Sequence, residues 1–126
     1  MKDLIIEKSK ISPYVNFGNT TGVFRLEGRS IHENPDSFYR NIFKWVDKYF
    51  QNPAEKTLVV MKLEYANSGS SKFILELLRI IKKHYDTGNP CIVEWYYEEE
   101  DEAIYNLGLH YKESIQIPFN IKIVYE

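Results

Sequence analysis

A cluster of small polar residues between an apolar run and an amphipathic segment is the first place in this sequence where chemistry is expected. The members of this serine cluster are Asn67, Ser68, Gly69, Ser70 and Ser71. The run before it, LVVMKLEY, is typical of a strand, and the segment after it is typical of a helix. Such a junction favours two interpretations: the cluster caps the helix, or one hydroxyl is a site of covalent modification.

Ser68 is well placed for phosphorylation. It is expected where the carboxyl end of a strand meets a helix amino terminus, the edge of an open α/β sheet at which ligands bind. A phosphoryl group there would meet free backbone N–H groups and the positive end of the helix dipole. It would add a charge of about −1.5 to −2, which changes the partner that fits this edge.

The other polar residues give little support for catalysis or a metal site. A nucleophilic serine needs a nearby base, and His32, His84 and His110 are expected on three different elements. The sequence has neither a G-x-S-x-G motif nor a glycine-rich phosphate loop. The acidic run at 98–102 is more typical of a solvated helix start than of a metal site. We therefore expect no catalytic residue, no metal and no cofactor.

Composition narrows the class of protein further. The chain has 126 residues and a net charge of −2, which predicts one domain over 1–126 and argues against nucleic-acid binding through a basic field. Cys91 is the only cysteine, and no segment reaches the roughly 18 apolar residues that a membrane span needs. We expect a cytoplasmic protein that does not enter the membrane. Aromatic residues make up 15% of the chain, which indicates either a core of large side chains or a partner-binding face.

Hydrophobic periodicity predicts an α/β fold with a mixed central sheet of about five to six strands and about three helices. Strands are expected at 4–9, 13–17, 23–28, 57–66, 91–98 and 120–126, and helices at 32–52, 68–85 and 103–114. Asn34 is predicted to cap the first helix, with Pro35 at its first position. That helix carries two adjacent apolar stripes, which predicts deep burial or a docking surface. The run LVVM at 58–61 lacks alternation, which predicts a central strand covered on both faces.

Three stretches together resemble the SiaC family of bacterial regulatory phosphoproteins. The first is LEGRSIHENPDSFYRNIFKW, similar to the family's Gly-x-Ser-x-x-Glu-Asn-Pro-x-x-Phe-Tyr signature. The second is LEYANSGSSKFILELL, similar to its Tyr-x-Asn-Ser/Thr-Ser-Ser pattern before a helix. The third is VEWYYEEEDEAIYNLG, similar to its Trp-x-Tyr followed by acidic residues and a glycine. Gly69 departs from the family pattern, which has serine there, and Asn41 stands where the family often has proline.

The resemblance implies a single STAS-like domain, similar to anti-sigma-factor antagonists, that acts as a non-enzymatic partner switch. It implies phosphorylation at Ser68 by a dedicated kinase of the histidine-kinase-like ATPase type, with Ser70 and Ser71 as alternatives. A PP2C-like phosphatase would reverse the modification, and the unmodified form would bind a target such as a diguanylate cyclase. The expected partner-binding residues are Tyr65, Asn67, Ser68, Gly69, Ser70, Lys72, Glu33 and Asn34.

Two other interpretations remain open at this point. The same edge near Ser68 and Glu33 would also suit a small-ligand binder or an enzyme. A constitutive adaptor, in which the serines only cap a helix, is the third possibility.

Overall fold

Three strands are followed by three helices that alternate with three further strands in the computed structural model, which describes residues 1–124. The elements are β1 (Leu4–Ile6), β2 (Tyr14–Phe17), β3 (Val23–Ser30), α1 (Asp36–Tyr49), β4 (Thr57–Ala66), α2 (Ser68–Asp86), β5 (Cys91–Glu98), α3 (Glu102–Ile115) and β6 (Phe119–Val124). The predicted α/β fold is confirmed. The last strand was expected to reach residue 126, but residues 125 and 126 lie outside the described part.

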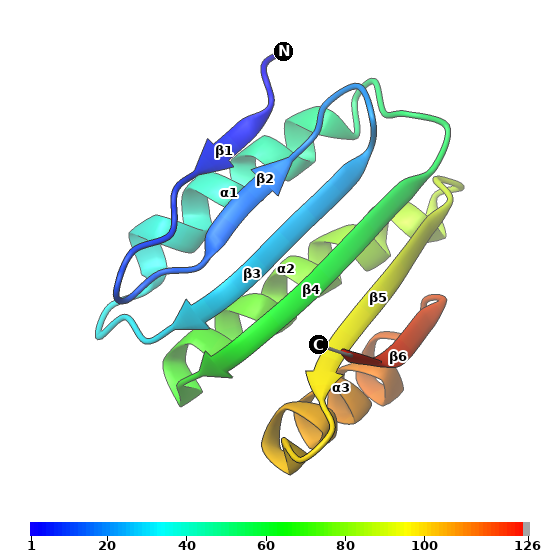
Figure 1. The fold of residues 1–126 in the computed structure, drawn as a ribbon. Coiled ribbons are helices and arrows are strands. Elements are labelled where there is room, and N and C mark those ends of the chain that lie inside the picture. Colours follow the sequence, from blue (N-terminus) through cyan, green and yellow to red (C-terminus); the bar gives the residue numbers. More distant parts are fainter. Residues whose placement is uncertain (125–126) are drawn as a thin grey trace.

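The strands form one mixed sheet in the order β1-β2-β3-β4-β5-β6 (Figure 1). The first three strands are antiparallel neighbours, and β2 and β3 form a hairpin. From β3 to β6 every pairing is parallel. Each parallel connection passes through a helix, as in right-handed βαβ units.

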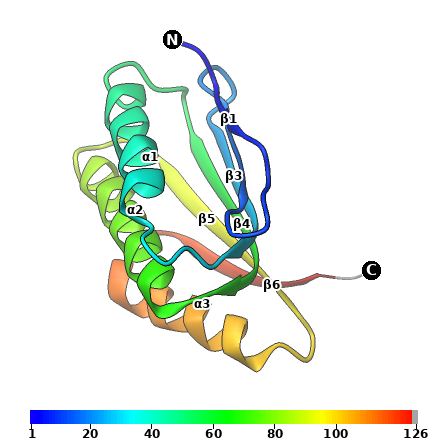
Figure 2. The same cartoon turned by 90° about the vertical axis from the view of Figure 1, so that its left-hand side faces the viewer.

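All three helices lie on the same face of the sheet, which leaves the other face uncovered by helices (Figure 2). We call the uncovered side the open face. Its cross-strand rows are formed by the side chains Arg25, Glu27, Lys62, Glu94, Tyr96 and Lys122. None of the described helices is long and apolar enough to cross a membrane.

The prediction that the LVVM run is covered on both faces by other elements is wrong. Val59 and Met61 are buried beneath the helices, whereas Val60 belongs to the open face. Val60 is nevertheless only 4% exposed. Its cross-strand neighbours are Arg25 and Glu94, and the aliphatic parts of such long side chains shield apolar neighbours from water. Flanking charged residues therefore replace a second layer of helices at this position.

Large aromatic side chains fill the space between the helices and the sheet. Fully buried members include Phe17, Phe24, Tyr39, Tyr49, Trp95 and Tyr111. Both apolar stripes of α1 are buried or half-buried, which confirms the deep-burial interpretation of that helix. Among the tyrosines within residues 1–124, Tyr65 and Tyr105 remain exposed.

The predicted cap of α1 is wrong. Pro35 directly precedes Asp36 and is the N-cap residue, although its dihedral angles are helical (φ −77°, ψ −5°), and no side chain bonds to the helix start. Asn34 lies one residue earlier and is exposed. Proline preorganises the first turn through its fixed φ, which lets this helix begin without a side-chain cap.

Candidate functional site

Three helices begin at one edge of the sheet. Strands β3, β4 and β5 are parallel, so their carboxyl ends share this edge, and α1, α2 and α3 follow them directly. We call it the carboxyl edge; it lies at the lower left of Figure 1. In open α/β sheets this is the edge where ligands bind.

Asn67 fixes the start of α2. Its side-chain oxygen accepts a hydrogen bond from the backbone N–H of Ser70 at 2.9 Å, and its amide nitrogen donates to the carbonyl of His32 at 3.0 Å. Its backbone N–H donates to the carbonyl of Ser30 at 3.1 Å. One asparagine therefore caps the helix and also ties the β3–α1 connection to it, so capping does not require the serines.

The three serines of the cluster differ sharply in access. Ser68 is the first residue of α2 and is exposed. Ser70 is 0% exposed, and its hydroxyl has no hydrogen-bond partner among the described residues. Ser71 is half-buried, and its hydroxyl donates to the carbonyl of Ser68 at 2.9 Å. A kinase acting on this conformation therefore finds a free hydroxyl at Ser68 and a buried one at Ser70.

The remaining predicted partner-binding residues surround Ser68 from two connections. Tyr65, 49% exposed, pairs with Arg29 in the sheet beside a register shift, and Lys72 is exposed one helical turn after Ser68. Glu33 and Asn34 are exposed on the β3–α1 connection, which Asn67 holds through His32. Gly69 faces Pro35 of the same connection: a Cβ at Gly69 would lie 3.8 Å from the proline ring.

A hollow also borders the β3–α1 connection. It is lined by Ile11, Ile31, His32, Glu33 and Asn34. Burial lowers the pKa of His32, because the imidazolium would lose part of its hydration. His32 is therefore mainly neutral at pH 7.

Several motif residues have structural roles that the sequence alone did not assign. The hydroxyls of Ser30 and Tyr39 are hydrogen-bonded at 2.7 Å within the core, and burial raises the pKa of Tyr39 to about 12. A side chain at Gly108 would overlap the indole ring of Trp95, whose N–H donates to the carbonyl of Ile104 at 3.0 Å. The Trp-x-Tyr and glycine pattern is therefore a packing requirement of β5 against α3.

Tyr111 connects α3 to the serine cluster. Its hydroxyl donates to the carbonyl of Ser71 at 2.6 Å. Burial raises the pKa of Tyr111 far above its usual range, so the phenol keeps its proton for this bond. Nothing in the sequence indicated which carbonyl Tyr111 would meet.

The three helix starts carry different charges. Asp36 lies in the first turn of α1. In α3, Asp101 is the N-cap and Glu102 lies in the first turn. The first turn of α2 contains no acidic residue. The positive end of the α2 dipole is thus without a neighbouring carboxylate on its own helix. No group of three or more potential metal ligands occurs within residues 1–124.

Solved structures share this fold along nearly the whole chain. The crystal structure of apo-SiaC from Pseudomonas aeruginosa has a TM-score of 0.90 at 23% identity, covering 97% of this chain and 99% of that one. A structure of the diguanylate cyclase SiaD in complex with its activator SiaC, from the same organism, gives 0.90 at 22% identity over 97% and 100% of the two chains. These similarities establish an α/β fold of the same arrangement.

The family follows from the sequence match. A model of the SiaC family of regulatory phosphoproteins matches residues 6–124. A protein of Pseudomonas aeruginosa (strain UCBPP-PA14) is 23% identical over 122 residues, which is 97% of each chain. The chain therefore belongs to the SiaC family of regulatory phosphoproteins, as the three motifs predicted.

Proposed function

We propose that this chain is a non-enzymatic, cytoplasmic switch of one domain over 1–126, and that phosphorylation of Ser68 decides which partner it binds. The exposure of the Ser68 hydroxyl at the start of α2 carries the proposal, because the neighbouring Ser70 is buried. The absence of an acidic residue from the first turn of α2 supports it, because an added dianion meets the helix dipole unopposed.

A dedicated kinase of the histidine-kinase-like ATPase type adds the phosphoryl group, and a PP2C-like phosphatase removes it. The unmodified form binds and activates a diguanylate cyclase. In support, SiaC of Pseudomonas aeruginosa is the activator of the diguanylate cyclase SiaD and forms a complex with it. The docking surface comprises Tyr65, the α2 start and the Glu33–Asn34 segment, which Asn67 holds beside Ser68. On docking, a phosphate at Ser68 would lose water against the partner, and a tenfold loss of affinity needs only about 1.4 kcal/mol.

The site of modification is tested by mass spectrometry of protein isolated from its native host. We expect one phosphoryl group on the peptide that contains Ser68, its loss in Ser68→Ala, and its retention in Ser71→Ala. Ser71 is the matched control because it is a neighbouring hydroxyl of lower exposure. Modification confined to Ser70 or Ser71 would contradict the choice of hydroxyl, and the lack of any phosphorylation would contradict the switch.

The consequence for binding is tested by calorimetric titration with the cyclase encoded by the same host. Unmodified protein and Ser68→Ala should bind alike, and phosphorylated protein should bind at least about tenfold more weakly. Ser68→Asp should fall between them because it carries one charge and fewer acceptor oxygens. If the phosphorylated and unmodified forms bound the cyclase with equal affinity, phosphorylation of Ser68 would not control partner binding, and the proposal would fail.

A further inference from the structure

The open face of the sheet is unusual for parallel strands. Parallel sheets are generally covered on both faces, because their connections place helices there. Here β3 to β6 are parallel, yet α1, α2 and α3 all lie on the opposite face (Figure 2). A protein surface of this kind is a candidate for covering by another chain.

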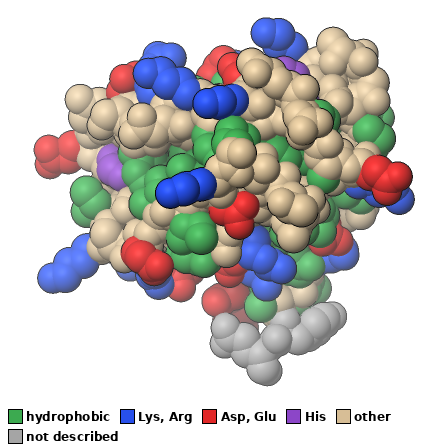
Figure 3. All heavy atoms as spheres, turned by 90° about the horizontal axis from the view of Figure 1, so that it is seen from above, with side chains coloured by type: hydrophobic (Ala, Val, Ile, Leu, Met, Phe, Trp, Pro, Cys, Tyr) green, Lys and Arg blue, Asp and Glu red, His purple; other side chains and the backbone are tan. Residues whose placement is uncertain are grey.

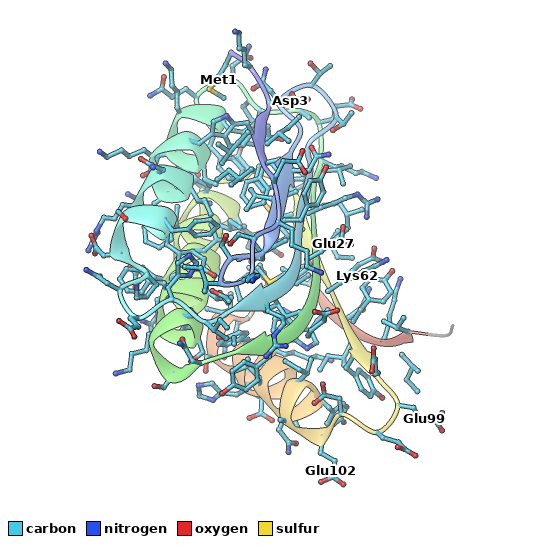
Figure 4. The ribbon with its side chains drawn as sticks, turned by 60° about the vertical axis from the view of Figure 1, so that its left-hand side comes forward. Met1, Asp3, Glu27, Lys62, Glu99 and Glu102 are labelled. Carbon is cyan, nitrogen blue, oxygen red and sulfur yellow. The ribbon has the colours of Figure 1, made fainter. Side chains whose placement is uncertain are left out.

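The open face is hollowed near the carboxyl edge. A depression of about 410 Å³ lies between the β1–β2 connection, which contributes Lys8, and the β5–α3 connection, which contributes Asp101. Its floor includes Glu27, Lys62 and Tyr96. Glu27 and Lys62 project from the sheet away from the helices (Figure 4). The volume is within the range of about 300–1,000 Å³ typical of ligand pockets.

Two lysines of the open face, of which Lys62 lines the hollow, already interact with the ring of Tyr96. The ammonium of Lys62 lies 4.8 Å from the ring centroid of Tyr96, and that of Lys122 lies 5.9 Å from it. Lys122 is also paired with Glu94. Tyr96 thus interacts with cations through its ring face in the free protein, as expected for an aromatic ring with a negative face.

The negative charges at the end of the hollow are not engaged in this way. Glu64 and Glu98 line the hollow, are exposed, and form no ion pair with any residue of 1–124. Glu99 and Glu100 follow on the exposed loop that forms one wall. The tyrosine rings Tyr96 and Tyr97 line the same hollow. Carboxylates beside aromatic rings complement a cationic side chain.

We propose that this hollow docks a basic segment of a partner protein, with an arginine held between the ring of Tyr97 and the carboxylates of Glu64 and Glu98. Arginine suits the site better than lysine because its planar guanidinium stacks on aromatic rings and binds carboxylates through two hydrogen bonds. A protein segment, as opposed to a small cation, follows from the uncovered parallel sheet around the hollow, which offers area for packing beyond a single charge. The site is on the opposite face from the helix layer that contains Ser68, so binding does not require the phosphorylation switch.

A peptide titration followed by NMR tests the proposal on the full chain. The probe is a short peptide of alternating glycine and arginine, and the comparison probe has glutamate in place of arginine. We expect backbone shift changes centred on Glu64, Tyr97 and Glu98 with the arginine peptide only. The double variant Glu64→Gln/Glu98→Gln should raise the Kd about tenfold, which corresponds to about 1.4 kcal/mol.

A matched control separates site binding from general attraction to an acidic protein. Glu55→Gln/Glu113→Gln removes the same charge at two exposed carboxylates that do not line the hollow, and its Kd should stay within about twofold of the wild type. An equal loss in the control variant, shift changes outside the hollow, or equally tight binding of free arginine amide would each overturn the proposal.

Discussion

The starts of α2 and α3 are built alike but charged differently. Asn67 caps α2 by accepting from the backbone N–H of Ser70 at 2.9 Å, and Asp101 caps α3 by accepting from that of Ile104 at 3.0 Å. The cap of α3 is a carboxylate, and Glu102 adds another in its first turn, whereas α2 has none. A helix start can therefore be capped without its dipole being compensated. The start of α2 is capped by a neutral side chain, and no carboxylate of its own first turn compensates its dipole.

The difference matters because the start of α2 is also tied to the later part of α3. Tyr111 of α3 holds the carbonyl of Ser71, and Ser71 in turn holds the carbonyl of Ser68. Trp95 holds the carbonyl of Ile104 in the first turn of α3. A charge added at Ser68 therefore acts on a rigid, capped turn. The following predictions test the two halves of this comparison, beginning with the largest effect.

Replacing the helix glycines should have opposite effects in the two helices. Gly108→Ala should destabilise the fold by about 1–3 kcal/mol, because the new methyl group overlaps the buried ring of Trp95. Gly69→Ala is the matched control: its methyl group would lie 3.8 Å from its nearest neighbours, so we expect a gain of about 0.5 kcal/mol from helix propensity. Urea unfolding followed by circular dichroism measures both. A neutral Gly108→Ala would show that α3 can move away from β5.

Removing the caps should cost both helices stability, and α2 more. We expect losses of about 0.5–2 kcal/mol for Asp101→Ala and Asn67→Ala, with Asn67→Ala the larger because it also releases the carbonyl of His32. Asn34→Ala serves as control and should stay within about 0.5 kcal/mol, because Asn34 does not cap α1. The same unfolding measurement applies. If Asn34→Ala lowered the free energy of unfolding as much as the two cap variants do, Asn34 would have to cap α1 after all.

Cutting the bond between the helices should have an intermediate effect. Tyr111→Phe keeps the buried ring and removes only the hydroxyl that meets Ser71, so we expect a loss of about 0.5–1.5 kcal/mol. Amide hydrogen exchange should show faster opening of the first turn of α2, with the amides of α1 as the internal reference. Unchanged exchange at residues 68–71 would mean that α3 does not stabilise this turn.

Changing the charge alone should give the smallest effect and the sharpest comparison. Gly69→Glu should be more stable than Gly69→Ala by about 0.3–1 kcal/mol, because the carboxylate compensates the α2 dipole. Glu102→Gln should lose a similar amount from α3. Both differences should shrink in 1 M salt, which screens exposed charges. If Gly69→Glu gained nothing over Gly69→Ala, the electrostatic support for a phosphate at this turn would fail.

Local sequence signals predicted most of the fold, because each element carries its own periodicity and end signals. The exposed serine at the start of α2 was predicted in the same way, since strand, cap and helix follow one another directly. The predictions of the α1 cap and of a second covering layer over the LVVM run were wrong because neighbouring residues in the fold determine both features. Pro35 replaced Asn34 at the first helix start, and the burial of Val60 reflects cross-strand charged side chains that no local pattern reveals.

The features that came from the structure alone are long-range contacts. Ser70 is indistinguishable from Ser68 by composition, and only tertiary packing buries it. The bond from Tyr111 to Ser71 spans 40 residues, and the hollow on the open face combines residues from β1–β2, the middle strands and β5–α3. Such contacts depend on the order and twist of the strands. Many residues spread along the chain determine these together, so no local sequence pattern reveals them.

The opposite edge of the sheet, seen in Figure 3 with acidic and basic side chains interspersed, offers a place to attach a reporter. The α2–β5 connection lies there. Its exposed Gly88 has open space beside it but a φ of 109°, which disfavours any other residue, so a reporter belongs on a residue inserted next to it. The ten residues of β4 run between the two edges, a length of about 33 Å at about 3.3 Å per residue. A dye inserted at this connection would therefore stand clear of a partner at the carboxyl edge. It would also remain within range for energy transfer to a second dye carried by that partner.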